Sequence, residues 1–181
     1  MIAVLADPAV YAEDFLSKHS DLAAINFSSH FVISAKHTEL AEIEANLKRR
    51  NLTFQRLPVS IAFHSRWMDP ARLPFETFMK SIRCNTGVLP MMCCERAVTL
   101  SALPGGYFWS AVRNPIRFRD AIAELELQGA CRYIDVGPAG TLATFLKYVL
   151  PADSKSTLHS VLTPFGQDRK NLASLLGSGS H

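Results

Sequence analysis

The residues best suited to chemistry in this chain of 181 residues are its six histidines and four cysteines. No two histidines have the His-x-His or i, i+4 spacing of a metal site, and the cysteines show no Cys-x-x-Cys spacing. The adjacent pair Cys93-Cys94 is poorly placed to form a disulfide with itself. We therefore predict free thiols, no metal and no other cofactor.

His64 stands apart from the other histidines by its context. The stretch from Pro58 to Pro70 indicates a strand that ends at His64 and a helix that begins at Asp69-Pro70. In open α/β sheets, ligands bind beyond the carboxyl ends of the strands, and a histidine there can accept and return a proton near neutral pH. Position alone leaves a catalytic and a structural role for His64 equally open.

The elements that must position His64 fall into two parts. Residues 1–60 show strand patterns at 2–5, 23–27, 31–34 and 54–60, with helices after Asp7-Pro8 and over 38–50. This order, β-α-β-β-α-β, is typical of a ferredoxin-like unit.

Residues 61–176 alternate longer helices with single strands. Helices are predicted after Asp69-Pro70, after Asn114-Pro115 and after the turn Gly-Pro-Ala-Gly140, and strands at 132–136 and 158–162. Such alternation favours a parallel sheet covered by helices. Residues 177–181, Gly-Ser-Gly-Ser-His, are typical of a linker that runs into a purification tag.

Composition narrows the classes of partner. Hydrophobic residues make up 48% of the chain and charged residues 19%, which indicates a well-packed globular protein. The net charge is only +3, and the basic residues gather only at Lys48, Arg49, Arg50 and Arg56, which is too few for a nucleic-acid surface. No apolar run approaches the roughly 20 residues that span a bilayer, and the start lacks a signal-peptide pattern. We expect a cytoplasmic protein that binds neither nucleic acid nor membrane.

Four segments, taken together and in order, resemble one known family. They are Ala24-Ile-Asn-Phe-Ser-Ser with Phe31-Val-Ile-Ser-Ala35, Val59-Ser-x-x-Phe-His-Ser-x-x-Met68, Tyr107-Phe-Trp-x-x-x-x-Asn-Pro-Ile-Arg-Phe118 and Asp135-Val-Gly-Pro-x-x-x-Leu142. The family is that of malonyl-CoA:acyl-carrier-protein acyltransferases, which includes the acyltransferase domains of polyketide synthases. The second segment resembles the family's catalytic-histidine motif.

The resemblance implies a fold and a boundary. In this family a serine on a GHSxG turn and a carboxylate-binding arginine precede the small ferredoxin-like subdomain, and this sequence contains no GxSxG. We therefore expect an α/β protein: a ferredoxin-like small subdomain at 1–60, then the C-terminal half of an α/β-hydrolase-like acyltransferase subdomain at 61–176. The missing N-terminal segment, or neighbouring polyketide synthase domains, are expected partners.

The resemblance also assigns roles. His64 would be the general base that activates the absent serine, which forms an acyl-enzyme from malonyl-CoA and passes the malonyl group to the phosphopantetheine thiol of an acyl carrier protein. A backbone carbonyl in the segment 111–113, that of Ala111, would orient His64. Asn26 and Phe63 would line the substrate pocket, and Phe63 before the histidine favours malonyl over branched acyl groups.

Two alternatives remain open beside malonyl transfer in polyketide or fatty-acid biosynthesis. Acyl hydrolases that clear stalled acyl groups from carrier proteins share the histidine motif. The chain alone could instead be an inactive module that docks a carrier protein, and we expect that this polypeptide alone transfers nothing.

Overall fold

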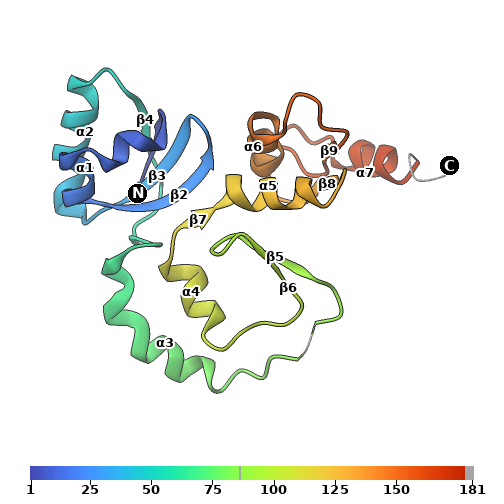
Figure 1. Ribbon diagram of the computed structural model, residues 1–181, viewed down its shortest axis with the longest axis horizontal. Helices are drawn as coiled ribbons and strands as arrows, with labels where there is room; N and C mark the ends of the chain where they lie inside the picture. Colours follow the sequence, from blue (N-terminus) through green and yellow to red (C-terminus); the bar gives the residue numbers. More distant parts are fainter. Residues whose placement is uncertain (86, 178–181) are drawn as a thin grey trace. The chain divides into compact units, whose positions relative to one another are not determined.

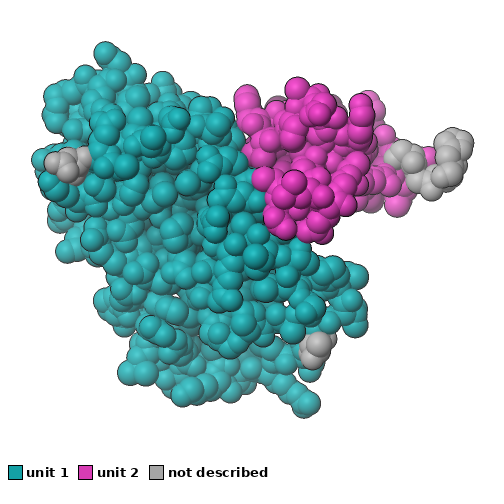
Figure 2. Space-filling model, viewed as in Figure 1, with its two compact units in different colours: residues 1–121 teal, residues 122–181 magenta. Residues whose placement is uncertain are grey.

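The computed structural model describes residues 1–85 and 87–177, with Asp14 described by its backbone alone. The chain forms two compact units, residues 1–121 and residues 122–181 (Figures 1 and 2). The predicted linker and tag lie outside the described residues, apart from Gly177. No helix in the described ranges is long and apolar enough to cross a membrane.

The first unit is built on a five-stranded sheet of order β4-β1-β3-β2-β7. Its first four strands pair antiparallel, whereas β7 runs parallel to β2. In chain order the elements are β1 (Ile2–Leu5), the 3-10 turn η1 (Pro8–Ala12), α1 (Asp14–His19), β2 (Asp21–Phe27), β3 (His30–Ser34), η2 (His37–Glu39), α2 (Leu40–Arg49), β4 (Thr53–Arg56) and β7 (Ile116–Arg117). The predicted β-α-β-β-α-β order is confirmed.

Strand alternation decides which face of this sheet each side chain occupies. Ile2, Val4, Phe31 and Ile33 pack under the helices α1 and α2 and form one buried cluster with apolar side chains of these helices. The opposite face carries Val32, and by the period of two it carries Ser34 as well. This second face is the one on which the loop containing His64 is anchored.

Helix α2 shows why the sequence folds as predicted here. Leu40, Ile43 and Leu47 recur on one face and are buried. Acidic residues begin the helix and basic residues end it, which matches the helix dipole. Asn51 then takes a left-handed conformation with φ of 54°, a usual way to end a helix.

The rest of the first unit agrees with prediction in part: helices follow Asp69-Pro70 and Asn114-Pro115 as predicted, whereas a hairpin and a further short helix were not predicted. It consists of η3 (Arg66–Ala71), α3 (Arg72–Met79), the hairpin of β5 (Met91–Cys93) and β6 (Val98–Leu100), α4 (Tyr107–Arg113) and the start of α5 (Phe118–Leu127). The predicted strand running to His64 is wrong: β4 ends at Arg56, and the chain beyond it pairs with no strand. Pro58 has no N–H to donate to a ladder, and Val59 donates to the carbonyl of Leu57, two residues back.

The second unit contains the parallel pair β8 (Arg132–Asp135) and β9 (Thr157–Ser160), with α6 (Thr141–Val149) and α7 (Asp168–Gly177). The predicted parallel pairing is therefore present. Among the described residues of this unit, the parallel sheet has two strands. Asp135 ends β8 and is buried; its carboxylate accepts hydrogen bonds from the backbone of Gly137 and of Ala143, at 2.8 and 2.9 Å. These bonds fix the turn that leads into α6.

Candidate active site around His64

His64 lies on a bend between β4 and η3, in a backbone conformation that residues other than glycine rarely adopt. Its φ is 57°, in the left-handed region. A conformation of this kind costs free energy and persists only where the surroundings hold it. Here the backbone N–H of His64 donates to the carbonyl of Val112, at 2.8 Å, in helix α4.

The same helix end also orients the imidazole ring. Nδ1 of His64 lies 2.8 Å from the backbone carbonyl oxygen of Asn114. A carbonyl can only accept, so Nδ1 carries the proton and Nε2 keeps its lone pair. This is the tautomer in which Nε2 can take a proton from a nucleophile.

The prediction that Ala111 supplies the orienting carbonyl is wrong, because that carbonyl belongs to Asn114. Asn114 caps the C-terminus of α4 in an extended conformation, with ψ of 157°. It precedes Pro115, and a residue before proline is driven out of the helical region by steric clash. Its carbonyl therefore does not point along the helix as the other carbonyls do, and it accepts a hydrogen bond from Nδ1 of His64 instead.

Burial shifts the titration of His64. Its side chain is about half buried, and the loss of solvent lowers the pKa of the imidazole below the ordinary value of 6.5. The hydrogen bond to the Asn114 carbonyl opposes this by favouring the protonated ring. The net pKa is lowered, so His64 is neutral and able to accept a proton at neutral pH.

Asn114 is itself held from the β5–β6 hairpin. Its side-chain Nδ2 donates to Oε1 of Glu95, at 3.0 Å, and the backbone N–H of Arg117 donates to the carbonyl of Cys94, at 2.7 Å. Glu95 and Asn114 are 19 residues apart, and no spacing in the sequence links them. Glu95 is thus a positioning residue that sequence reasoning missed.

A bidentate ion pair ties the start of η3 to the same helix end. Nε and Nη2 of Arg113 lie 2.6 and 3.3 Å from the two carboxylate oxygens of Asp69. The Arg113 guanidinium holds the pKa of the Asp69 carboxyl below its usual range. His64 and the segment that follows it are therefore both attached to α4 and its cap.

The loop is also attached to the sheet. The Ser34 hydroxyl, at the end of β3, donates to the carbonyl of Phe63, and Ser34 is fully buried. The backbone N–H of Arg66 donates to Oδ2 of Asp21, at 2.6 Å, at the start of β2. Because Asp21 pairs with Ser34 across the two strands, both bonds anchor the loop at one end of the sheet.

Of the two predicted pocket residues, the structure brings one close to His64. The rings of Phe63 and His64 have centroids 6.4 Å apart. Asn26 is buried, and its Nδ2 lies 2.9 Å from Nδ1 of His30 in the β2–β3 hairpin. It stands five residues along β2 from Asp21, about 16 Å at the rise of a strand. The structure therefore separates Asn26 from the anchoring point of the His64 loop.

The described residues contain one group with ligand atoms close enough to hold a metal ion. His19, Glu39 and Glu42 offer such atoms within 4.8 Å of one another. His19 already pairs with Glu39 at 2.7 Å, and Glu42 is exposed. The arrangement is that of a surface ion pair beside a further carboxylate, and we assign no metal to it.

Known proteins resemble this chain in sequence and in fold. No family model matches the chain. It is 38% identical over 173 residues to the "Polyketide biosynthesis acyltransferase homolog BaeD" of Bacillus velezensis and 40% identical over 173 residues to the homolog PksD of Bacillus subtilis. Each match covers 95% of this chain and 53% of the relative, so the chain spans about half the length of these curated relatives.

Solved structures agree in fold. The acyltransferase domain of the second module of the salinomycin polyketide synthase matches with a TM-score of 0.82 and 26% identity, over 97% of this chain and 42% of that one. The malonyl CoA-acyl carrier protein transacylase of Clostridium perfringens matches with a TM-score of 0.80 and 22% identity, over 98% and 56% of the two chains.

Together, the two curated relatives and the shared fold define an acyltransferase-type α/β protein. The chain belongs to the family of polyketide synthase acyltransferase domains and malonyl-CoA:acyl-carrier-protein acyltransferases, of which it represents a part. The resemblance carried by the four sequence motifs is thereby confirmed at the level of the family.

Proposed function

We propose that this chain is part of an acyltransferase that moves a malonyl group from CoA to the phosphopantetheine thiol of an acyl carrier protein. The observation that carries the proposal is the contact of His64 Nδ1 with the Asn114 carbonyl, which leaves Nε2 as a base. The family relationship and the lowered pKa of His64 support it further.

The reaction would use His64 twice. Nε2 first takes the proton of a serine hydroxyl, and the serine oxygen attacks the malonyl thioester; the CoA thiolate then leaves with that proton. In the second half, Nε2 takes the proton of the carrier-protein thiol, whose sulfur attacks the malonyl-serine ester, and the serine recovers its proton. In both halves the Asn114 carbonyl stabilises the charged imidazolium through Nδ1–H.

The serine is proposed to lie in the part of the acyltransferase that the chain does not span. In this scheme residues 1–60 form the small subdomain and residues 61–176 contribute to the large one. Phe63 would border the acyl group, since its ring adjoins that of His64. Asn26 would line a more distant part of the pocket on the same sheet.

The test is His64→Ala in the longer parent polypeptide, with transfer of radiolabelled malonyl from CoA to carrier protein as the readout. Removing a general base is expected to lower transfer by roughly 100-fold or more. His159→Ala, in β9, is the matched control and should leave the rate near that of the parent. Near-normal transfer by the His64 variant would contradict the proposal, and release of free malonate instead of transfer would assign the hydrolase.

A further inference from the structure

The turn of the β5–β6 hairpin has a conformation that needs support from outside the hairpin. Its four residues, 94–97, join Cys93 to Val98, and the backbone N–H of Ala97 donates to the carbonyl of Cys93 at 2.7 Å. Ala97 has φ of 55°, in the left-handed region that favours glycine. Such a conformation costs free energy in a residue with a side chain and persists only where contacts hold it. The contacts of the turn therefore indicate its role.

The turn is attached to the segment that follows α4. The Cys94 carbonyl accepts from the backbone N–H of Arg117 at 2.7 Å, and the Arg96 carbonyl accepts from Nη1 of Arg117 at 3.5 Å. A third contact joins Oε1 of Glu95 to Nδ2 of Asn114 at 3.0 Å. Of these three contacts, only the one from Glu95 holds the residue whose carbonyl accepts from the imidazole of the proposed base.

Glu95 is suited to this contact because its carboxylate is largely withdrawn from water. Its side chain is 18% exposed, and Oε2 accepts from Nε of Arg96 at 3.1 Å. A carboxylate can only accept, so the amide of Asn114 must turn its NH₂ group toward it. A hydrogen bond to a charged acceptor is also stronger than one between neutral groups. Glu95 thus fixes the side chain of Asn114 in one orientation.

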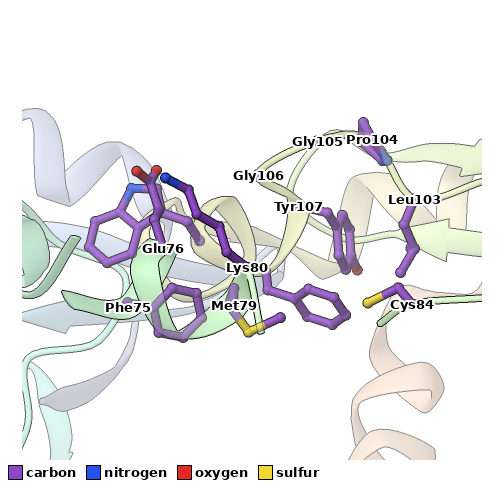
Figure 3. A pocket seen from close by; sticks show the side chains of 12 residues that line it. Phe75, Glu76, Met79, Lys80, Cys84, Leu103, Pro104, Gly105, Gly106 and Tyr107 are labelled. Carbon is purple, nitrogen blue, oxygen red and sulfur yellow. The ribbon is translucent and has the colours of Figure 1, made fainter. Parts of the chain in front are cut away.

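The beginning of α4 offers less support. Figure 3 shows Phe75 and Met79 of α3 across from Tyr107, in the first turn of α4. These residues line a cavity of about 460 Å³, so this end of the helix borders open space as well as packed side chains. The position of the far end therefore depends strongly on its own contacts, of which the bond from Asn114 to Glu95 is one.

We infer that Glu95 is a positioning residue for the transfer reaction and that it acts through Asn114. Glu95 holds the Asn114 side chain, the Asn114 carbonyl accepts from Nδ1 of His64, and Nε2 on the opposite side of the ring is thereby aimed. In a Ser-His-Asp triad a buried carboxylate orients the imidazole directly. Here the carboxylate does so through one intervening residue. This step rests on the proposed function in taking His64 as the base.

The first test measures malonyl transfer by the longer parent polypeptide and separates kcat from KM. Glu95→Ala should lower kcat about tenfold and leave KM within about twofold, because a misdirected base slows the chemical step without changing substrate binding. Glu42→Ala, at an exposed glutamate of α2, is the matched control and should keep the parent kcat. A parent-like kcat in Glu95→Ala would overturn the inference.

An exchange of the two side chains covers the case in which Glu95→Ala folds poorly. Asn114→Asp alone sets two carboxylates against each other and should lower kcat on the order of tenfold or more. Adding Glu95→Gln makes the pair an amide and a carboxylate again, with donor and acceptor reversed, and should restore kcat to within about threefold of the parent. No restoration in the double variant would show that the two side chains do not act as a pair, which would also overturn the inference.

The pH dependence distinguishes positioning from a merely structural role. Burial lowers the pKa of His64, and the bond to the Asn114 carbonyl partly offsets this. Loosening that bond in Glu95→Ala should lower the pKa of His64 further, so the acid limb of kcat moves to lower pH. A loss of folded protein alone would reduce transfer at every pH and leave the acid limb in place, which would contradict the inference.

Titratable groups beside the hairpin and the His64 loop do not obscure this readout. Burial raises the pKa of Cys94 and of Tyr107, so both stay neutral as the pH falls below 7. The Arg113 guanidinium lowers the pKa of the Asp69 carboxyl, which therefore stays ionised there. The acid limb near pH 6 thus reports the titration of His64.

Failure of this inference and failure of the proposed function give different results. If His64→Ala transfers malonyl normally, the proposed function is wrong and the inference falls with it. If His64→Ala loses transfer while Glu95→Ala and Asn114→Asp leave it unchanged, the function stands and Glu95 is not a positioning residue. Loss of transfer in both single variants, with the acid limb of Glu95→Ala displaced and the exchange restoring kcat, is the expected result.

Discussion

At the scale of single residues, the chemistry of the site depends on which ring nitrogen of His64 has a free lone pair. Nδ1 of His64 faces a carbonyl that can only accept, and this one contact determines that Nε2 keeps its lone pair, as the proposed base requires. Burial lowers the pKa of the same ring and keeps it neutral near pH 7. Geometry and titration therefore favour the same chemistry, which neither the residue type nor its spacing could establish alone.

Ser34 offers a test of how the loop is held. Its buried hydroxyl donates to the Phe63 carbonyl, so Ser34→Ala leaves that carbonyl without its donor. We expect the free energy of unfolding, measured by urea denaturation, to fall by about 1–2 kcal/mol. Ser29→Ala, at an exposed position of the β2–β3 turn, is the control and should change it by less than about 0.5 kcal/mol. Equal values for the two variants would show that the hydroxyl does not anchor the loop.

At the scale of elements, local sequence predicted the ferredoxin-like sheet well. Strands of four to seven residues that contain short apolar runs, and a helix with Leu40, Ile43 and Leu47 on one face, carry strong local signals. The strands β5 and β6 have three residues each, which is too short for any periodicity to show. Helix α4 was missed for a similar reason, since it is only seven residues long and follows two glycines.

The candidate site was predicted in part for the same physical reasons. A motif places His64 because its residues are contiguous, and the family resemblance indicated the segment 111–113. The acceptor, the carbonyl of Asn114, was missed because its direction depends on where α4 ends and on Pro115. Glu95 was beyond reach, since only the folded hairpin brings it to Asn114.

The turn after β8 gives a second prediction at this scale. The two carboxylate oxygens of Asp135 accept from Gly137 N–H and Ala143 N–H, so Asp135→Asn turns an amide NH₂ toward one of these donors. We expect the free energy of unfolding to fall by roughly 1–3 kcal/mol, the cost of a buried donor left unpaired. Asp153→Asn, at an exposed acid of the same unit, should have little effect. If the two variants unfold alike, Asp135 does not hold the turn.

At the scale of the whole molecule, the chain carries the proposed base, His64, and spans about half of its relatives' length. Helix α3 and the segment after it expose several large apolar side chains, among them Leu73, Phe78, Val88 and Leu89. The proposed base His64 and helix α4, whose backbone holds it, lie together in the unit of residues 1–121.

The proposed absence of the nucleophilic serine from this chain predicts how the chain behaves alone. Incubated with radiolabelled malonyl-CoA, it should retain no label after denaturing electrophoresis, because a stable acyl-enzyme needs a positioned serine. The same chain combined with the remaining part should become labelled. Stable labelling of the chain alone would show that it carries a nucleophile of its own.

The most direct test of the central claim is the pH dependence of malonyl transfer by the complete enzyme. His64 must be neutral to act, and burial lowers its pKa, so the neutral fraction is nearly complete at pH 7 to 8 and declines only as the pH falls below about 6.5. We predict that the transfer rate of the parent enzyme is constant above neutral pH and falls as the pH becomes acidic. The residual rate of the His64→Ala variant should not show this fall at acidic pH. An acid limb that is unchanged in the His64→Ala variant would contradict the assignment of His64 as the base.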